Sequence, residues 1–388
     1  MKRKTIALYT GEVPPAPFLE RLALGLAQME YSVLLMGSVR RRVVYDSPFL
    51  RVVGPSKGWT RYLFFLRYAF LLTVFQPKAK QKLDRMLQEE GRFTYSHRIK
   101  YYPVLYHKPD VFHLQWAKSV ADWAWVKHFG MRYVVSLRGA HINYSPICDP
   151  QLAELYRTYF PEVDAFHAVS EAISQEAQLY LAPAESIRVI YSGLSLSDWK
   201  FRPKETPSKV FTLVSVGRAH WIKAYPFALD VAYELKQKGI VFRYELLGVE
   251  PTEELLFQCE QLNLLDSVFF LPPVPPAAVS GYIQKADVLF LPSYKEGIAN
   301  VVLEAMALGT LVVTSDSGGM TEVVRSGENG FVFPTRDVEA AVARLLELQQ
   351  LDAVSRLRLL ENARATIEAQ HSAQLMLAGF ESLYSFNS

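Results

Sequence analysis

Short apolar segments alternate with longer helix-like segments throughout the second half of the sequence. Six of these apolar segments have the length and the Val, Leu and Phe content of buried strands: Thr212–Val216, Phe242–Leu247, Val268–Leu271, Asp287–Leu291, Leu311–Thr314 and Phe331–Phe333. Because a helix between two strands returns the chain in the same direction, the alternation predicts an α/β fold with a doubly wound parallel sheet. Ligands of such sheets bind at the carboxyl ends of the strands.

The first half repeats this pattern less regularly. A helix is expected at Phe18–Met29, and strands are expected at Thr5–Tyr9, Ser32–Met36, Asp110–Trp116, Tyr133–Leu137, Ala165–Val169 and Ile187–Tyr191. Residues 192–207 then lack an apolar period and contain two prolines, which is typical of a linker. Since 388 residues suit two domains, we expect one at residues 1–198 and the other at residues 199–370.

Composition restricts the compartment and the partners. The two cysteines, Cys148 and Cys259, cannot form a disulfide framework, which favours a reducing, cytoplasmic location. The apolar run near the N-terminus is too short for a signal peptide, and no stretch of 18 uncharged apolar residues could span a membrane. Residues 1–200 hold 26 Lys and Arg against 17 Asp and Glu, whereas the remainder is acidic. Without a nucleic-acid motif, this asymmetry points to membrane phospholipid or a phosphorylated acceptor.

The segment Ser293–Glu322 holds the densest set of candidate binding groups. A loop, Tyr294–Ala299, separates a strand from a predicted helix at Asn300–Leu308, with Asn300 as the N-cap and Gly309 as the terminator. Gly318 and Gly319 are expected to open another helix near Met320. Loop amides and a helix N-terminus suit a phosphate or a sugar oxygen.

Two carboxylates of this segment, Glu296 and Glu304, could face one ligand. Glu296 lies in the loop, Glu304 lies one turn into the helix, and helical side chains lean toward the N-terminus. Each carboxylate can accept two hydroxyl hydrogen bonds, as a sugar or ribose diol requires. The alternative is that Glu304 is a solvated helix residue and Glu296 an ordinary loop charge.

The whole segment resembles the donor-site signature of the retaining GT-B glycosyltransferases of family 4, the glycosyl transferases group 1. Their pattern is E-G-x-P-N-x-x-x-E-A-M-A, followed later by G-G-x-x-E. The chain supplies Glu296, Gly297, Asn300, Glu304, Ala305, Met306 and Ala307, and then Gly318, Gly319 and Glu322. It departs from the pattern at Ala299, where proline is common. Gly217, Arg218 and Lys223 similarly resemble the family's G-R-x-x-x-x-K motif.

This resemblance implies two Rossmann-like domains facing a cleft, with the C-terminal helix, residues 371–388, crossing back to the first domain. It implies a retaining, hexosyltransferase-type enzyme that moves a sugar from a nucleoside diphosphate sugar to a glycan or lipid-linked acceptor. Arg218 and Lys223 would neutralise the departing diphosphate, and Glu296 would hold the sugar. The other residues implied on the donor side are Gly11, Gly217, Val274, Gly297, Ile298, Ala299, Asn300 and Glu304.

No metal and no cofactor are expected. The sequence contains no Asp-x-Asp triplet, which speaks against the divalent-metal donor site of the other major glycosyltransferase fold. The cation pair Arg218 and Lys223 would take over the role of a metal ion.

The first half resembles the family more loosely. His113 matches the first histidine of the family's D-V-I-H-x-H-W segment, and Gln115 replaces the second. Arg138 stands where many relatives carry a histidine near the reacting sugar. On the acceptor side, Arg138 could bind a phosphate or carboxylate, with His141 nearby.

Residues 59–75 form an unusual run, WTRYLFFLRYAFLLTVF, with seven aromatic residues, two arginines and no acid. One interpretation is a helix packed in the core and followed by a basic tail. The other is a helix at a membrane interface, with peripheral membrane contact through residues 59–85 at the inner face of the membrane. Arg67 within the run argues against a spanning helix.

Two other functions remain open at the level of sequence. Sugar-nucleotide 2-epimerases share the two-domain fold, and fold alone does not decide function. The second alternative is a protein that binds a nucleotide sugar without catalysing a reaction. The presence of Arg218, Lys223, Glu296 and Glu304 together favours transfer over both.

Overall fold

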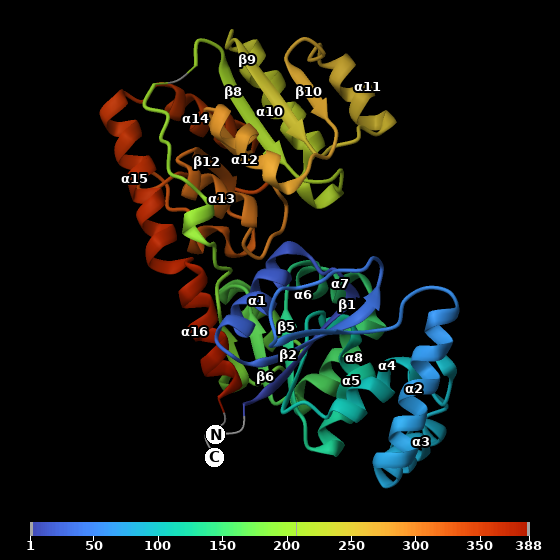
Figure 1. Ribbon diagram of the computed structural model, residues 1–388. Coiled ribbons are helices and arrows are strands. Elements are labelled where there is room, and N and C mark those ends of the chain that lie inside the picture. The colour runs from blue at the N-terminus through green and yellow to red at the C-terminus, as the bar shows by residue number, and fades with distance from the viewer. Residues whose placement is uncertain (1–2, 207, 386–388) are drawn as a thin grey trace. The chain divides into compact units, whose positions relative to one another are not determined.

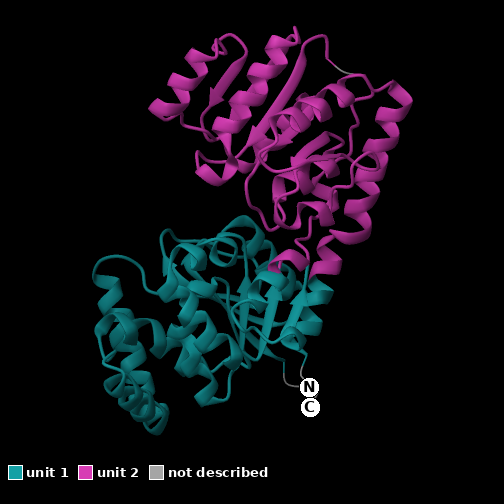
Figure 2. Cartoon of the chain, turned by 180° about the vertical axis from the view of Figure 1, so that it is seen from behind, with its two compact units in different colours: residues 1–168, 174–190, 377–388 teal, residues 169–173, 191–376 magenta. Residues whose placement is uncertain are grey.

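The computed structural model describes residues 3–206 and 208–385, which fall into two compact units (Figure 2). Unit 1 comprises residues 1–168, 174–190 and 377–388, and unit 2 comprises residues 169–173 and 191–376. The chain passes between the units at residues 190–191, eight positions before the domain boundary that the sequence suggested. Residues 386–388 of the expected C-terminal helix, and Pro207 of the expected linker, lie outside the described residues.

Unit 1 is built on a seven-stranded parallel sheet (Figure 1). The strands pair in the order β3-β2-β1-β4-β5-β6-β7. Their bounds are β1 (Thr5–Val13), β2 (Ser32–Val39), β3 (Leu50–Val53), β4 (Val111–Leu114), β5 (Arg132–Leu137), β6 (Ala165–Ala168) and β7 (Ile187–Val189). β3, a four-residue edge strand, was missed from the sequence because LRVV is too short to show a period.

Unit 2 is built on a six-stranded parallel sheet in the order β10-β9-β8-β11-β12-β13. Its strands are β8 (Phe211–Val216), β9 (Phe242–Leu247), β10 (Val268–Leu271), β11 (Val288–Leu291), β12 (Leu311–Ser315) and β13 (Phe331–Phe333). All six predicted strands are confirmed, as is the fold class of two doubly wound parallel sheets.

Helices connect the strands on both faces of each sheet. Those of unit 1 are α1 (Pro17–Gln28), α2 (Trp59–Phe75), α3 (Pro77–Glu89), α4 (Tyr95–His107), α5 (Val120–Trp123), α6 (Ala140–Asn143), α7 (Ser145–Cys148) and α8 (Pro150–Tyr159). Those of unit 2 are α10 (Tyr225–Gln237), α11 (Glu253–Gln261), α12 (Pro276–Lys285), α13 (Asn300–Leu308), α14 (Val338–Gln349) and α15 (Ala353–Gln370). Residues of α9 (Glu171–Gln178) and α16 (Ala373–Tyr384) belong to both units.

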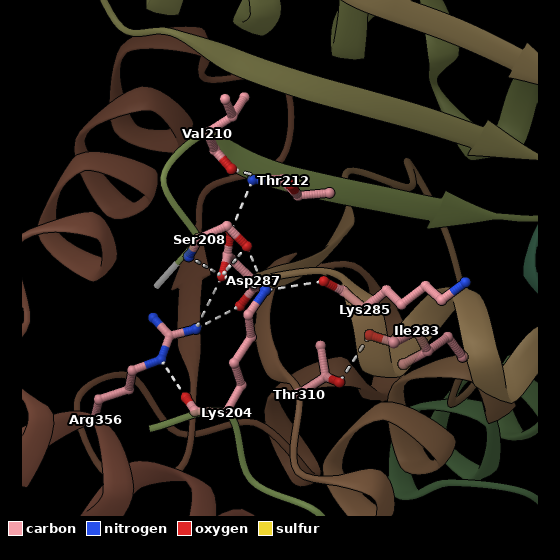
Figure 3. A network of polar contacts seen from close by, with 9 residues as sticks. All are labelled: Lys204, Ser208, Val210, Thr212, Ile283, Lys285, Asp287, Thr310 and Arg356. Atoms are coloured by element: carbon pink, nitrogen blue, oxygen red, sulfur yellow. Dashed lines mark hydrogen bonds and ion pairs between the residues drawn. The ribbon is translucent and has the colours of Figure 1, made fainter. Parts of the chain in front are cut away.

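Carboxylates placed just before strands tie neighbouring strands together at their amino ends. Asp110 accepts from the Thr5 amide at 2.7 Å. In unit 2 the fully buried Asp287 accepts from the Ser208 amide at 3.0 Å and the Thr212 amide at 2.9 Å. Arg356 of α15 joins the same network (Figure 3) by donating to the Asp287 carbonyl at 3.0 Å. A buried carboxylate is tolerated only when it is paired in this way, so the network fixes where β8 and β11 start.

Candidate functional site

Strand order reverses once in each sheet, and in unit 2 it does so between β8 and β11. The chain leaves β8 toward β9 on one side, and it leaves β11 toward β12 on the other. Doubly wound sheets bind ligands outside the carboxyl ends of the strands at this switch point. The loop after β8 holds Arg218 and Lys223, and the loop after β11 holds Glu296. The structure therefore places all three predicted catalytic residues at one edge of one sheet.

Lys223 ends a short 3-10 helix, Trp221–Lys223, in the loop between β8 and α10. Ala224 follows with a φ of 55°, in the left-handed region, and turns the chain into α10. The loop is fixed to its neighbour because the Tyr294 amide donates to the Ile222 carbonyl at 2.8 Å. The main chain therefore holds Lys223 beside the loop that carries Glu296.

Lys223 and Glu296 form an ion pair, with Nζ and Oε1 separated by 2.6 Å. Their side chains are only 19% and 17% exposed, so solvent screens the pair less than it would a surface pair. Burial, and then the negative charge of Glu296, raise the pKa of the nearby Tyr225, whose hydroxyl donates to the Gly217 carbonyl at 3.1 Å. The sequence predicted that Lys223 binds the diphosphate of a donor and that Glu296 holds its sugar. It missed that they contact each other.

Arg218 lies beside this pair in the chain, and its side chain is exposed. Across residues 3–206 and 208–385, no carboxylate forms an ion pair with its guanidinium. Burial, followed by the charges of Arg218 and Lys223, lowers the pKa of His220. Arg218 therefore remains available for an anionic group at this edge.

Two glycines after β12, Gly318 and Gly319, pack against the loop that carries Glu296. The Gly319 amide donates to the Gly297 carbonyl at 2.8 Å. Gly318 has a φ of 58°, and a Cβ there would lie 1.9 Å from the Glu296 carbonyl oxygen, so no other residue fits. The predicted helix near Met320 is wrong, because Gly318–Glu322 forms only a 3-10 helix. The two glycines therefore allow the backbone to pack closely against the Glu296 loop, and they do not start an α-helix.

Helix α13 follows the Glu296 loop and begins at Asn300. The prediction that Asn300 is the N-cap is wrong, because Ala299 occupies that position and no side chain caps the helix. The Asn300 Oδ1 atom is buried and has no protein partner. Gly309 ends the helix with a φ of 85°, as predicted. Glu304 is half-buried on α13, one turn after Asn300.

Two apolar residues predicted on the donor side border the same core cluster of unit 2. Val274 and Ile298 are partly buried and pack against it, although they come from loops after different strands. Gly217 lies at the end of β8, and its amide donates to the Leu247 carbonyl at 2.9 Å. These residues therefore lie in loops after strands of the same sheet that carries Arg218 and Lys223.

Unit 1 has its own switch point, between β1 and β4. Gly11 lies there, with a φ of 81°, at a register shift in the pairing of β1 with β2. β1 continues past Gly11 to Val13, and α1 starts at Pro17. Gly11 is therefore a strand residue rather than part of an open turn.

A chain of buried polar groups crosses the core of unit 1. His113 Nδ1 lies 2.7 Å from the Tyr384 hydroxyl, and His113 Nε2 lies 2.9 Å from Ser136 Oγ. Ser136 Oγ in turn lies 2.8 Å from His167 Nδ1. Burial, and secondarily the charge of Arg138, hold the pKa values of both histidines well below their usual range. These histidines are neutral, hydrogen-bonded core residues at physiological pH.

Arg138 follows β5, and its side chain has no acidic partner among the described residues. Its Nη2 donates to Gln115 Oε1 at 3.2 Å, and its guanidinium lies 4.8 Å from the centre of the Phe18 ring. Arg138 Nε and Gln115 Nε2 are buried without a partner. Burial lowers the pKa of Arg138 to about 10. This edge of unit 1 therefore carries a cation and an amide donor that no protein group satisfies.

His141 lies close to the same edge, on the short helix α6. Its ring centre lies 5.4 Å from that of Trp116, and its Nδ1 is buried without a partner. Burial, and then Lys118, lower the pKa of His141 to about 4. The two residues predicted on the acceptor side, Arg138 and His141, thus lie three positions apart at the end of β5, together with Gln115.

Metal ligands are not grouped in the part of the chain that the structure describes. No set of three or more His, Cys, Asp or Glu side chains there has a geometry suited to a metal ion. None of the described helices combines the length and the apolar content needed to cross a bilayer.

Residues 197–366, which contain every motif residue of unit 2 from Gly217 to Glu322, match the family model for glycosyl transferases group 1. This part of the chain is therefore similar to the glycosyl transferases group 1 family. Over 228 residues it is 29% identical to a protein of Escherichia coli described as the putative colanic acid biosynthesis glycosyltransferase WcaL. That match covers 57% of this chain and 56% of WcaL.

A second relative and a solved structure give the same result. The amylovoran biosynthesis glycosyltransferase AmsK of Erwinia amylovora is 27% identical over 257 residues, covering 64% of this chain and 63% of AmsK. The chain thus spans about three fifths of the length of these relatives. HepE of Anabaena, solved with UDP and glucose, superposes with a TM-score of 0.71 over 99% of this chain and 100% of HepE at 17% identity. This likeness shows that both units share the fold of HepE.

Proposed function

We propose that this protein is a retaining glycosyltransferase that uses a nucleoside diphosphate sugar as its donor. The observation that carries the proposal is the meeting of Arg218, Lys223 and Glu296 at the switch point of the unit 2 sheet. These residues lie within the matched glycosyl transferases group 1 domain. The HepE complex supports a UDP-type donor, because that neighbour was solved with UDP and glucose.

The three residues would divide the work on the donor. Charge builds up on the diphosphate as its bond to the sugar breaks, and preorganised cations stabilise that charge. Lys223 supplies a point charge, and the unpaired Arg218 supplies a planar fork that can bind two phosphate oxygens. Glu296 keeps Lys223 in place in the free enzyme and accepts hydrogen bonds from sugar hydroxyls when the donor is bound. The amides of residues 297–299 add further donors at the same edge.

Glu304 would bind the ribose of the donor from the first turns of α13. It lies away from the breaking bond, so its contribution is to affinity rather than to the chemical step. Front-face attack by the acceptor would retain the anomeric configuration without an enzyme nucleophile.

The reaction is expected to need no metal ion and no cofactor. The argument rests on sequence chemistry, namely the missing Asp-x-Asp triplet and the cations Arg218 and Lys223. Activity should therefore persist in excess EDTA. Complete loss that Mg²⁺ or Mn²⁺ restores would contradict this point.

The acceptor would be a glycan or lipid-linked glycan that carries a negative charge. Arg138 lacks an acidic partner, and its neighbour Gln115 has a buried donor without a partner. A carboxylate or phosphate of the acceptor would pair with the Arg138 guanidinium and accept a hydrogen bond from the Gln115 amide. The names of WcaL and AmsK support a role in polysaccharide biosynthesis.

The test is to incubate the protein with nucleotide sugars, with and without candidate acceptors, and to measure the release of nucleoside diphosphate. A transferase releases diphosphate only when an acceptor is present. An epimerase would interconvert donor sugars without an acceptor, and a silent binding protein would change neither. Product anomers determined by NMR would decide whether the configuration is retained.

A further inference from the structure

Helix α2 leaves most of its apolar surface uncovered. It lies with α3 and α4 in an insertion between β3 and β4 of unit 1 (Figure 1). Only Tyr68 and Leu72 of its 17 residues are buried. Phe65 is half-buried and stacks on Tyr102 of α4, with ring centres 5.8 Å apart. The packed side of α2 is therefore narrow, and most of the helix faces away from the unit.

The exposed side of α2 carries several large apolar side chains. Leu63, Leu66 and Phe70 are 64%, 60% and 65% exposed. Trp59 at the start of the helix is 85% exposed, and Val74 near its end is 51% exposed. These positions recur every three to four residues, so they form one continuous stripe along the helix. We call Trp59, Tyr62, Leu63, Leu66, Phe70 and Val74 the α2 stripe.

Contiguous exposed apolar surface of this kind marks an interaction site. The charges around the stripe identify the partner. No Asp or Glu occurs between Asp46 and Asp84, whereas this interval contains seven Lys and Arg residues. Arg67 lies within α2 itself, and the exposed Lys78 follows in α3. A basic rim around an apolar stripe complements an anionic lipid surface, where acyl chains cover the stripe and headgroups neutralise the rim.

A second copy of this chain fits the stripe less well. In a dimer that packed one α2 stripe against the other, the basic residues around the two stripes would face each other. No Asp or Glu occurs between Asp46 and Asp84 to form ion pairs between the two helices. Like charges held close together in this way are destabilising.

We propose that α2 is a membrane-docking helix that lies in the plane of an anionic bilayer with the α2 stripe among the acyl chains. The helix is about 25 Å long, shorter than the hydrocarbon core, and Arg67 keeps it at the interface. This inference does not depend on the proposed donor chemistry. Loss of docking would leave donor binding intact, and a failed transfer assay would leave docking intact.

The experiment compares sedimentation of the full chain with vesicles of phosphatidylcholine alone and with vesicles containing phosphatidylglycerol. The wild type should bind the anionic vesicles and release them as salt is raised. The double variant Leu66→Ser/Phe70→Ser should bind at least ten times more weakly. Its melting temperature should stay close to that of the wild type, because both side chains are mostly exposed.

One variant acts as the control, and two others test the charge and the position of α2. Phe257→Ser alters a phenylalanine of α11 that is 67% exposed, matching the 65% of Phe70, and it should bind vesicles as the wild type does. Arg67→Gln should weaken binding about fivefold, the factor expected for one cation near an anionic surface. Brominated lipids should quench part of the tryptophan fluorescence of the wild type and less in Trp59→Phe.

Three results would overturn the proposal. The wild type could ignore anionic vesicles, or Leu66→Ser/Phe70→Ser could bind them undiminished. Alternatively, light scattering could show a dimer that Leu66→Ser/Phe70→Ser dissociates, without any vesicle binding, which would assign the stripe to a second copy.

Discussion

At the carboxyl edge of the unit 2 sheet Lys223 is neutralised by Glu296, whereas at the carboxyl edge of the unit 1 sheet Arg138 has no acid beside it. Both edges are switch points of doubly wound sheets, which is where such sheets generally bind their ligands. The first edge departs from the family motifs only at Ala299, and the second departs from them at Gln115 and Arg138.

The comparison teaches that Lys223 of the unit 2 edge is paired before any ligand binds, whereas Arg138 of the unit 1 edge is not. We call these the complete edge and the incomplete edge, and Arg218 of the complete edge is still available for an anion. The Lys223–Glu296 pair holds its own geometry before a donor arrives, which is the preorganisation that electrostatic catalysis requires. Arg138 is held only by a neutral amide and an aromatic ring, and burial lowers its pKa to about 10. A bound anion would stabilise the charged form of Arg138 and raise its pKa again. We therefore expect this edge to prefer an acceptor that carries a negative charge.

The largest expected effect is that of Lys223→Ala, which removes the cation of the complete edge. Transfer should fall by about 10²–10³, or roughly 3–4 kcal/mol of transition-state stabilisation. Because Lys223 and Glu296 act as a unit, the double variant Lys223→Ala/Glu296→Ala should lose little more than the single one. Steady-state kinetics measure both. The matched control is Lys238→Ala on the exposed end of α10, which should be silent.

Acid should weaken unit 1 more than unit 2. Five unit 1 histidines have pKa values lowered by burial: His97, His107, His113, His141 and His167. Unit 2 has His371 and the less perturbed His220. The unfolded chain binds these protons near pH 6.5 and the native chain does not, so native stability falls as the pH drops from about 7 toward about 4.

Between pH 7 and pH 6 the unit 1 sheet should lose about 1–3 kcal/mol of stability. Hydrogen exchange, corrected for its intrinsic pH dependence, can follow the two sheets separately. If both sheets lost the same amount of protection between pH 7 and pH 6, the buried histidines would not control the acid sensitivity of unit 1.

Arg138→Ala should weaken acceptor binding about 10–30-fold, because it removes the cation of the incomplete edge. The affinity for donor should be unchanged. Arg138→Lys should recover part of the effect for a phosphate and less for a carboxylate, which prefers the planar fork. KM values for charged and neutral acceptors provide the measurement. An equal loss with a neutral acceptor would mean that Arg138 supports structure rather than recognition.

A smaller effect is expected for the two glutamates of the complete edge. Glu296→Gln should lower kcat about tenfold, since it weakens the grip on both Lys223 and the sugar. Glu304→Gln should raise the donor KM by a few-fold with little change in kcat, because ribose is remote from the chemistry. The division of roles fails if both variants show the same kinetic defect.

The sequence was sufficient for the strands of unit 2 because their apolar runs are continuous and separated by clear helices. It was also sufficient to place Arg218, Lys223 and Glu296 at one edge of the unit 2 sheet, since strand ends of a parallel sheet share an edge. It could not show that Lys223 and Glu296 touch, because their contact depends on the turn at Ala224 and on the fit of Gly318 under the Glu296 loop. Spacing alone likewise suggested an N-cap at Asn300 and a helix near Met320, and both are wrong.

Helix α2 illustrates a different limit. Its sequence is apolar on almost every side, so periodicity could not say which face would be covered. Only the packing of Tyr68 and Leu72 against the rest of unit 1 shows that the opposite stripe remains exposed.

The central claim is that the complete edge of unit 2 binds the diphosphate of a nucleotide sugar. Calorimetric titration with UDP, GDP and ADP in turn tests it most directly, using the wild type, Lys223→Ala, Arg218→Ala and the control Lys238→Ala. We predict that one nucleotide binds the wild type and Lys238→Ala equally, and that it binds each of the other two variants at least about tenfold more weakly, a difference of about 1.4 kcal/mol. Equal binding to all four proteins, or binding of none of the nucleotides to the wild type, would contradict the account.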